Sequence, residues 1–274
     1  MTERDKDIFN RLDEHWMESL DTFSYDQIVG LFLQGSQNYE LDTPDSDIDT
    51  KLIVAPTFRE IALNRQPVST THIRANNEHI DFKDIRLYMN TFRKQNLNFL
   101  EILFTDYFII PSAYYSTWMK LVERREEIAR MNPYRAVKSM AGIAKEKYHA
   151  MEHRYPSKID IIDKFGYDPK QVSHLVRVRD YLDRYVEGEL YEKCLRPSGE
   201  FFDLIMNLKL GKFSLAEARI IAEEHLFHIN KVSEEFYKKN EDKENLEMTD
   251  LLEEICYEIM KIAVENELGK TGSS

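Results

Sequence analysis

The stretch LFLQGSQNYELDTPDSDIDTKLIV, from Leu31 to Val54, decides the fold that the sequence predicts. Its two ends are apolar and favour β-strands, and between them lie a Gly-Ser pair and a loop of turn-forming residues. The loop contains four aspartates: Asp42, Asp45, Asp47 and Asp49. Negative charge placed between two buried strands needs either solvent or a cation to offset it.

The Asp47–Asp49 pair flanks Ile48 at the start of the second predicted strand. Residues two apart in a strand share a face, so we expect both carboxylates to point one way and Ile48 to point into the core. Neighbouring carboxylates repel, and a hard divalent cation such as Mg²⁺ offsets both charges through oxygen ligands. A solvated turn is the other interpretation, and it is the one we adopt for Asp42 and Asp45.

The Gly35-Ser36 pair ends the first predicted strand and precedes a short segment that could begin a helix. Glycine allows a ligand to approach the backbone closely, and the N–H groups of a new helical turn, with a serine hydroxyl, bind phosphate oxygens. A phosphate site beside paired carboxylates is what nucleotidyl transfer requires. Carboxylates around metal ions also occur in nucleases, but the Gly-Ser turn favours a triphosphate substrate over a simple phosphodiester.

Three blocks of the sequence resemble a known superfamily. GSQNYELDTPDSDID resembles the motif of the DNA polymerase β-type nucleotidyltransferases, in which a Gly-Ser pair precedes an Asp-x-Asp dyad. HIDFKDIRLYMNTFRKQNLNFLEILFTD and FGYDPKQVSHLVRVRDYL resemble two later blocks of a subfamily of predicted bacterial and phage nucleotidyltransferases. The resemblance covers roughly residues 28–190, and the final segment of the chain carries no motif that we can use.

The resemblance implies a third carboxylate on a neighbouring strand, and Asp81 in HIDFKDI is the matching residue. Ile80 and Phe82 should face the core, which would turn Asp81 towards the dyad. The superfamily implies that Asp47 and Asp49 bridge two Mg²⁺ ions, with Mn²⁺ as an alternative ion. It also implies that Asp81 binds only the catalytic ion and accepts the proton of the attacking hydroxyl.

Four further residues are candidates for contact with the nucleotide. Lys51 follows Asp49 by two residues, so it either touches a phosphate or offsets the acidic cluster. Lys170, His174 and Arg177 are spaced four and three apart, which places them on one face of a predicted helix. Such a face is either solvated or grips the triphosphate, and the resemblance to the subfamily favours nucleotide binding.

The fold class that the sequence predicts is α+β: a small mixed β-sheet with flanking helices, followed by an all-α helical bundle. Apolar periodicity predicts a first helix, two strands around the acidic loop, a strand at residues 79–85 and a helix at 86–103. We divide the chain into a catalytic domain at residues 1–110 and a helical domain at 111–274 that closes the nucleotide cleft. In the second domain, helix caps are predicted at Asn132, Asp168, Ser214 and Thr249.

Composition excludes several classes of protein. The net charge is −12, which argues against broad, nonspecific coating of nucleic acids. No apolar run approaches the roughly 20 residues needed to span a bilayer, and the N-terminus has no signal sequence, so we predict a cytoplasmic protein without membrane contact. Cys194 and Cys256 cannot form a disulfide framework or a zinc site by themselves.

The sequence therefore predicts Mg²⁺-dependent transfer of a nucleoside monophosphate from a nucleoside triphosphate to an acceptor hydroxyl, with release of pyrophosphate. A protein side chain, an RNA end such as that of tRNA, a nucleotide or a small molecule could be the acceptor. The alternative is a nucleotide-binding regulatory or antitoxin-like partner with little catalysis. The base, the sugar and the oligomeric state stay open.

Overall fold

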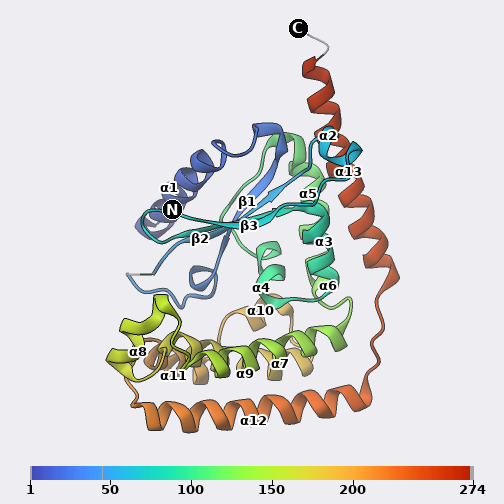
Figure 1. Ribbon diagram of the computed structural model, residues 1–274. Coiled ribbons are helices and arrows are strands. Elements are labelled where there is room, and N and C mark those ends of the chain that lie inside the picture. The colour runs from blue at the N-terminus through green and yellow to red at the C-terminus, as the bar shows by residue number, and fades with distance from the viewer. Residues whose placement is uncertain (1, 45, 272–274) are drawn as a thin grey trace. The chain divides into compact units, whose positions relative to one another are not determined.

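The computed structural model describes residues 2–44 and 46–271 (Figure 1). The fold class is α+β, as predicted, with a five-stranded mixed sheet followed by a largely helical region. Two compact units make up the chain: Met1–Met131 together with Glu244–Ser274, and Asn132–Lys243. The functional division at residue 110, and closure of a cleft by the second domain, stay predictions.

The sheet of the first unit has the strand order β3-β4-β2-β1-β5. β2 runs parallel to β4, and every other neighbouring pair is antiparallel. Two of these strands were not predicted, because all residues of β3 are exposed and β5 contains only two residues. The strands are β1 (Ile28–Gln34), β2 (Asp49–Val54), β3 (Ser69–Ile73), β4 (His79–Asp84) and β5 (Phe108–Ile109).

One face of the sheet packs against the first helix, α1 (Glu3–Ser19). Ile8 and Leu12 of α1 join a buried cluster with apolar residues of three strands. Apart from Ile28, which precedes a register shift in β1, the strand residues of the cluster alternate in sequence, as expected for one face of a sheet: Ile28, Leu31 and Leu33 of β1, Leu52 and Val54 of β2, and Ile80 and Phe82 of β4, with Ile48 just before β2. This alternation leaves Asp49, Lys51, Asp81 and Lys83 for the opposite face.

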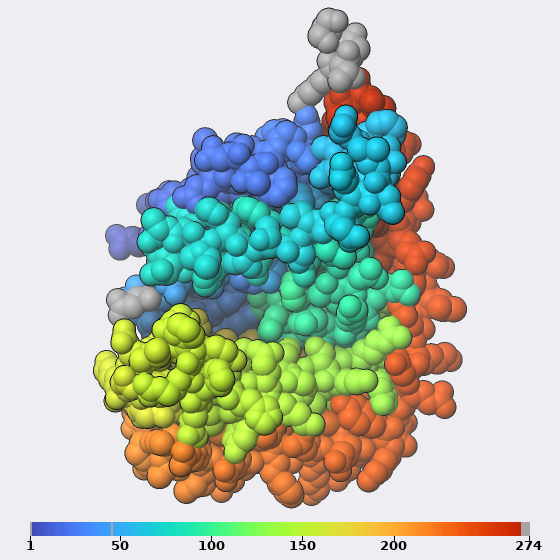
Figure 2. Space-filling model, viewed as in Figure 1, coloured from blue at the N-terminus to red at the C-terminus, as the bar shows by residue number. Residues whose placement is uncertain are grey.

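The opposite face packs against helices from the middle of the chain. Phe32 of β1 stacks on Trp118 of α5 (Ser112–Glu123), with ring centroids 4.6 Å apart. The last helix, α13 (Leu246–Thr271), lies along α5 and α3 (Ile85–Arg93) (Figure 1). It also lies against α2 (Phe58–Ala62) (Figure 2), where the Phe58 N–H donates to Glu267 at 2.7 Å. The first 131 residues and the last helix therefore form one unit.

The start of α13 differs from the prediction. Thr249 was expected to cap this helix, but the helix begins at Leu246. Asn245 provides the cap, because its Oδ1 accepts the N–H groups of Glu247 at 3.1 Å and Met248 at 3.4 Å. Thr249 lies one turn inside the helix and donates its hydroxyl back to the Asn245 carbonyl at 3.2 Å. Serine and threonine make such bonds inside helices as well as at caps, so residue type alone was not decisive.

The second unit is built around α9 (Pro169–Val186), whose apolar residues are largely buried. Three predicted caps are confirmed: the side chains of Asn132, Asp168 and Ser214 accept backbone N–H groups at the starts of their helices. No helix in the described part of the chain is long and apolar enough to cross a membrane. The helices of this unit are α7 (Pro133–Ala150), α8 (Ile159–Phe165), α9, α10 (Tyr191–Leu195), α11 (Gly199–Lys209) and α12 (Leu215–Lys239).

Candidate functional site

The Gly35-Ser36 pair forms a sharp turn at the end of β1. Gly35 has φ 97° and ψ −157°, a backbone conformation that is essentially restricted to glycine. Ser36–Tyr39 then forms one short 3₁₀ turn instead of a longer helix. The Gly35 N–H donates to the buried carboxylate of Glu101 at 3.3 Å, whereas the Ser36 hydroxyl makes no hydrogen bond within the described residues. The turn therefore exists as predicted, and the Ser36 hydroxyl is available to a ligand.

The Asp47–Asp49 pair lies on either side of the point where β2 begins. Asp47 belongs to the preceding loop and has an exposed side chain, and its carbonyl accepts the Gln37 side-chain amide at 2.7 Å. Asp49 is the first residue of β2, and its Oδ1 accepts the His79 N–H at 2.9 Å. Ile48 between them is 3% exposed and belongs to the core. The aspartates thus flank a buried residue, as the sequence indicated.

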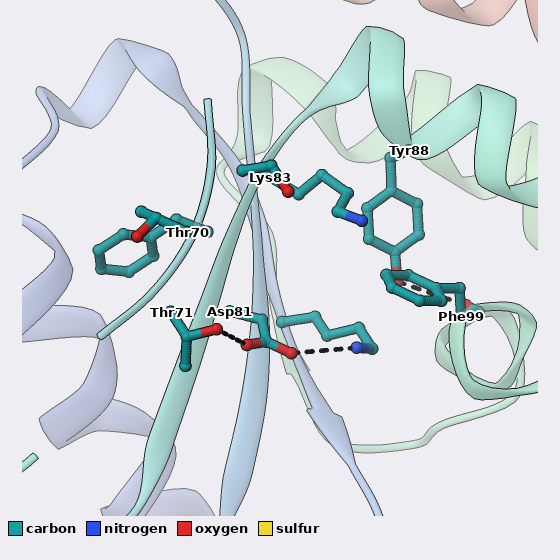
Figure 3. Close-up of a pocket in the computed structure, with 9 residues that line it drawn as sticks. Thr70, Thr71, Asp81, Lys83, Tyr88 and Phe99 are labelled. Atoms are coloured by element: carbon teal, nitrogen blue, oxygen red, sulfur yellow. Dashed lines mark hydrogen bonds and ion pairs between the residues drawn. The ribbon is translucent and has the colours of Figure 1, made fainter. Parts of the chain in front are cut away.

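Asp81 lies at the centre of β4, directly opposite Lys51 of β2 in the parallel register. Its neighbours Ile80 and Phe82 belong to the core on the other face, so Asp81 shares a face with Asp49. Its carboxylate accepts the Thr71 hydroxyl at 2.6 Å and pairs with Lys51 Nζ at 3.4 Å (Figure 3). The alternation expected around Asp81 is present, and both of its oxygens have contacts.

The acidic residues do not form a complete metal site by themselves. Within residues 2–44 and 46–271, no three Asp, Glu, His or Cys side chains lie together in a group that could hold a metal ion. Mg²⁺, however, is bound in proteins through one or two carboxylates together with water and substrate phosphates. Asp49 and Asp81 have side chains that are 27% and 32% exposed, respectively. These oxygen donors therefore fit an ion that arrives with a nucleotide better than a permanently bound one.

Two lysines and an aromatic ring line a cavity beside Asp81. Lys51 Nζ and Lys83 Nζ each lie 4.1 Å from the centroid of the Phe99 ring. Burial lowers the pKa of both lysines, and the Asp81 charge opposes that shift. The cavity has a volume of about 200 Å³. Lys51 pairs with Asp81, and its contact with a phosphate stays a prediction.

A buried network on the α1 face supports the backbone that carries the dyad. Glu78, only 1% exposed, accepts the N–H of Ile48 at 2.9 Å. Its carboxylate pairs with Arg11 and with Arg74, the latter at 2.7 Å. Because Ile48 lies between Asp47 and Asp49, Glu78 fixes the peptide from which both carboxylates project.

His15 completes this network from α1. Its Nε2 lies 3.0 Å from Glu78 and its Nδ1 lies 2.8 Å from the Thr50 hydroxyl. The carboxylate can only accept, so Nε2 carries the proton and Nδ1 accepts from Thr50. Burial, reinforced by the charges of Arg74 and Arg11, lowers the pKa of His15 to about 4. Neither His15 nor Glu78 has a motif spacing in the sequence, which is why both were missed.

The basic residues predicted on α9 gather within the second unit. Burial lowers the pKa of His174 well below its usual value, and the nearby charges of Arg177 and Lys170 act in the same direction. Lys147 and Lys209, from neighbouring helices, add smaller contributions of the same sign. Asp180 lies one turn further along α9 and contacts a different residue. Its carboxylate accepts the Ser198 N–H at 3.0 Å and the Ser198 hydroxyl at 2.6 Å. The predicted stripe is thus part of a larger basic cluster, whose contact with a nucleotide stays a prediction.

Comparisons with known proteins give only remote likenesses among solved structures. No family model matches the sequence, and no curated protein matches it. The chain is similar to the crystal structure of a nucleotidyltransferase-like protein from Exiguobacterium sibiricum, with 10% sequence identity and a TM-score of 0.31. The alignment covers 81% of this chain and 73% of that one. At this TM-score the likeness carries no weight by itself, so the chemistry is inferred from the side chains.

Proposed function

We propose that the protein is a Mg²⁺-dependent nucleotidyltransferase that moves a nucleoside monophosphate from a nucleoside triphosphate to an acceptor hydroxyl. The observation that carries the proposal is the arrangement around β2. The Gly35-Ser36 turn ends the strand on one side of β2, and Asp81 lies on the strand on its other side. Asp49 lies between them at the start of β2, so a phosphate-binding turn and two carboxylates meet along one edge of adjacent strands.

Each part of this arrangement has a role in the transfer. The Ser36 turn would contact the triphosphate, and Asp47 and Asp49 would hold Mg²⁺ together with its phosphate oxygens. Bound Mg²⁺ would stabilise charge on the attacking and leaving oxygens. The acceptor oxygen forms a bond to the α-phosphorus, the bond to the bridging oxygen breaks, and pyrophosphate leaves. Asp81 accepts the hydroxyl proton, for which it must exchange its contact with Lys51.

We further propose that the basic cluster on α9 contacts the nucleotide. Lys170, His174 and Arg177 present positive or hydrogen-bonding groups that would neutralise a triphosphate and hold the departing pyrophosphate. The lowered pKa of His174 keeps its imidazole neutral at pH 7, so Lys170 and Arg177 would supply the charge.

A nucleotide-binding partner with little catalysis is the second candidate function. The observation that favours it is the engagement of Asp81, because an aspartate that is permanently paired with Lys51 and Thr71 cannot accept a proton. Such a protein would bind the triphosphate through the Gly35-Ser36 turn without releasing pyrophosphate.

Incubation of the protein with each α-labelled nucleoside triphosphate and Mg²⁺ separates the two candidates. The enzyme releases pyrophosphate and labels a product, and Asp47→Ala with Asp49→Ala abolishes both signals. Asp106→Ala is the matched control, since it removes an exposed aspartate of the same unit that lies outside the site. Binding of the nucleotide without pyrophosphate release would support the regulatory candidate, and cleavage of nucleic acid without any triphosphate would indicate a nuclease.

A further inference from the structure

The cavity beside Asp81 has the features of a binding site for a second substrate. β2, β3, β4 and the segment around Phe99 contribute its walls, all within the first unit. Charged residues, hydroxyl residues and three aromatic residues make up its lining: Lys51, Asp81 and Lys83; Ser69, Thr70 and Thr71; Phe82, Tyr88 and Phe99. The Tyr88 hydroxyl donates to the Phe99 carbonyl at 3.3 Å, which fixes the aromatic wall (Figure 3).

Lys83 is the group in this cavity that lacks an anionic partner. Its ammonium group contacts the Phe99 ring (Figure 3), but no carboxylate of the described residues lies within ion-pair distance. Asp81, the one acidic residue of the lining, is paired with Lys51 instead. The charged lining groups therefore sum to one excess positive charge, carried by a half-buried ammonium. Partial burial of an unpaired charge is costly, and an incoming anion would remove that cost.

The sheet order separates this cavity from the turn proposed for the triphosphate. Gly35 ends β1 on one side of β2, whereas Asp81 and Lys83 lie on β4, on the other side. A donor held at the β1 side and an acceptor held at the β4 side would meet at the carboxylates between them. The cavity therefore faces the acceptor side of the proposed reaction.

The size and chemistry of the cavity restrict what it can hold. A volume of about 200 Å³ is below the roughly 300–1,000 Å³ of sites that enclose a drug-sized ligand. It accommodates an anionic group and the few atoms next to it, with the remainder of the ligand outside. Ser69, which is paired with Lys83 in the register of β3 and β4, places a hydroxyl donor beside the ammonium group, and the two groups together suit the oxygens of a phosphate monoester.

We infer that this cavity binds the acceptor, and that the acceptor is a small phosphorylated hydroxy compound whose phosphate is held by Lys83 and whose hydroxyl lies at Asp81. This inference rests on the proposed nucleotidyltransferase function and names the substrate class for it. The net charge of −12 repels long polyanions, which favours a small molecule over a nucleic-acid end.

Binding without Mg²⁺ or nucleotide tests this inference separately from the enzyme activity. The probes are inorganic phosphate, ribose 5-phosphate and ribose, at constant ionic strength, with the lysine side chains followed by NMR of isotope-labelled protein. Phosphate and ribose 5-phosphate should shift the Lys83 signal, and ribose should not. Lys83→Met keeps the apolar stem and should weaken binding on the order of tenfold or more, because a hydrogen bond to a charged group is lost. Lys6→Met, at an exposed lysine of α1 in the same unit, should bind like the wild type.

Three results would overturn the inference: no shift of the Lys83 signal, equal affinity of Lys83→Met and the wild type, or binding of a 5′-phosphorylated oligonucleotide but of no small phosphate. In active enzyme, Lys83→Met should raise the KM for the acceptor and leave the KM for the triphosphate unchanged. The opposite pattern would assign the cavity to the donor nucleotide. Lys83-dependent phosphate binding in a protein that releases no pyrophosphate would contradict the proposed function and leave the anion site in place.

Discussion

Lowering the pH should destabilise the first unit through the buried histidine His15. Its ring is 0% exposed, and its pKa falls from 6.5 to about 4 in the folded chain. A histidine with a depressed folded-state pKa contributes stability above its unfolded pKa, and that stability is lost as the pH falls from about 6.5 towards 4. The charged and titratable groups around His15 come from α1 and from the β3–β4 hairpin and the turn within it: Arg11, Glu18, His72, Arg74 and Glu78.

The size of the effect follows from the two pKa values of His15. One unit of pKa shift corresponds to about 1.4 kcal/mol. Between about pH 7 and pH 4.5 the unfolded chain takes up almost one proton more at this site than the folded chain, so the unfolding free energy should fall by about 2 kcal/mol. Asp and Glu side chains of the chain also take up protons as the pH falls. The comparison therefore needs a variant that lacks only the proton uptake of His15.

His15→Gln is that variant, since glutamine does not titrate and retains hydrogen-bonding groups. Urea unfolding is followed by tryptophan fluorescence at pH 7 and at pH 4.5. The chain has two tryptophans, Trp16 and Trp118, and both belong to the first unit, so the signal reports this unit alone. The wild type should lose about 2 kcal/mol more than His15→Gln between the two pH values. Equal losses in both proteins would refute the assignment of a buried, neutral His15.

Three further changes have defined outcomes. Gly35→Ala forces an alanine into a glycine-only conformation and should cost about 1–3 kcal/mol and weaken triphosphate binding, measured by urea unfolding and calorimetry. Its control, Gly142→Ala in α7, adds a methyl group where nothing lies within 4 Å and should stabilise the protein by up to about 1 kcal/mol. Asn245→Ala removes the cap of α13 and should lower the unfolding free energy by about 1 kcal/mol. Arg177→Met should weaken triphosphate binding about tenfold, and unchanged affinity would show that the α9 cluster does not contact the nucleotide.

The strands that local sequence patterns predicted are those that contribute apolar residues to the core. Ile48 just before β2, Leu52 of β2, and Ile80 and Phe82 of β4 lie in the core. The placement of Asp49 and Asp81 on the opposite face could therefore be inferred without coordinates. β3 has no buried residue and is held by backbone pairing with β4, which leaves no apolar signal in its sequence. Its pairing is nevertheless what brings Thr71 to Asp81.

Long-range contacts account for the parts of the site that the sequence did not indicate. Glu78 reaches the Ile48 N–H across thirty positions, and His15 reaches Glu78 across sixty-three. Each of these side chains has an ordinary local context, and only the packing of α1 on the sheet joins them. The ion pair of Lys51 with Asp81 has the same origin, because strand register rather than sequence spacing makes the two residues neighbours.

Binding of Mn²⁺ in the presence of a nonhydrolysable nucleoside triphosphate tests the central claim most directly. Electron paramagnetic resonance counts the bound ions in the wild type and in Asp49→Asn, Asp81→Asn and Asp106→Asn. The account predicts nucleotide-dependent Mn²⁺ binding that weakens at least about tenfold in the first two variants and is unchanged in the third, because charged ligands are lost only at residues 49 and 81. Mn²⁺ binding by Asp49→Asn and Asp81→Asn that equals the wild type would contradict it.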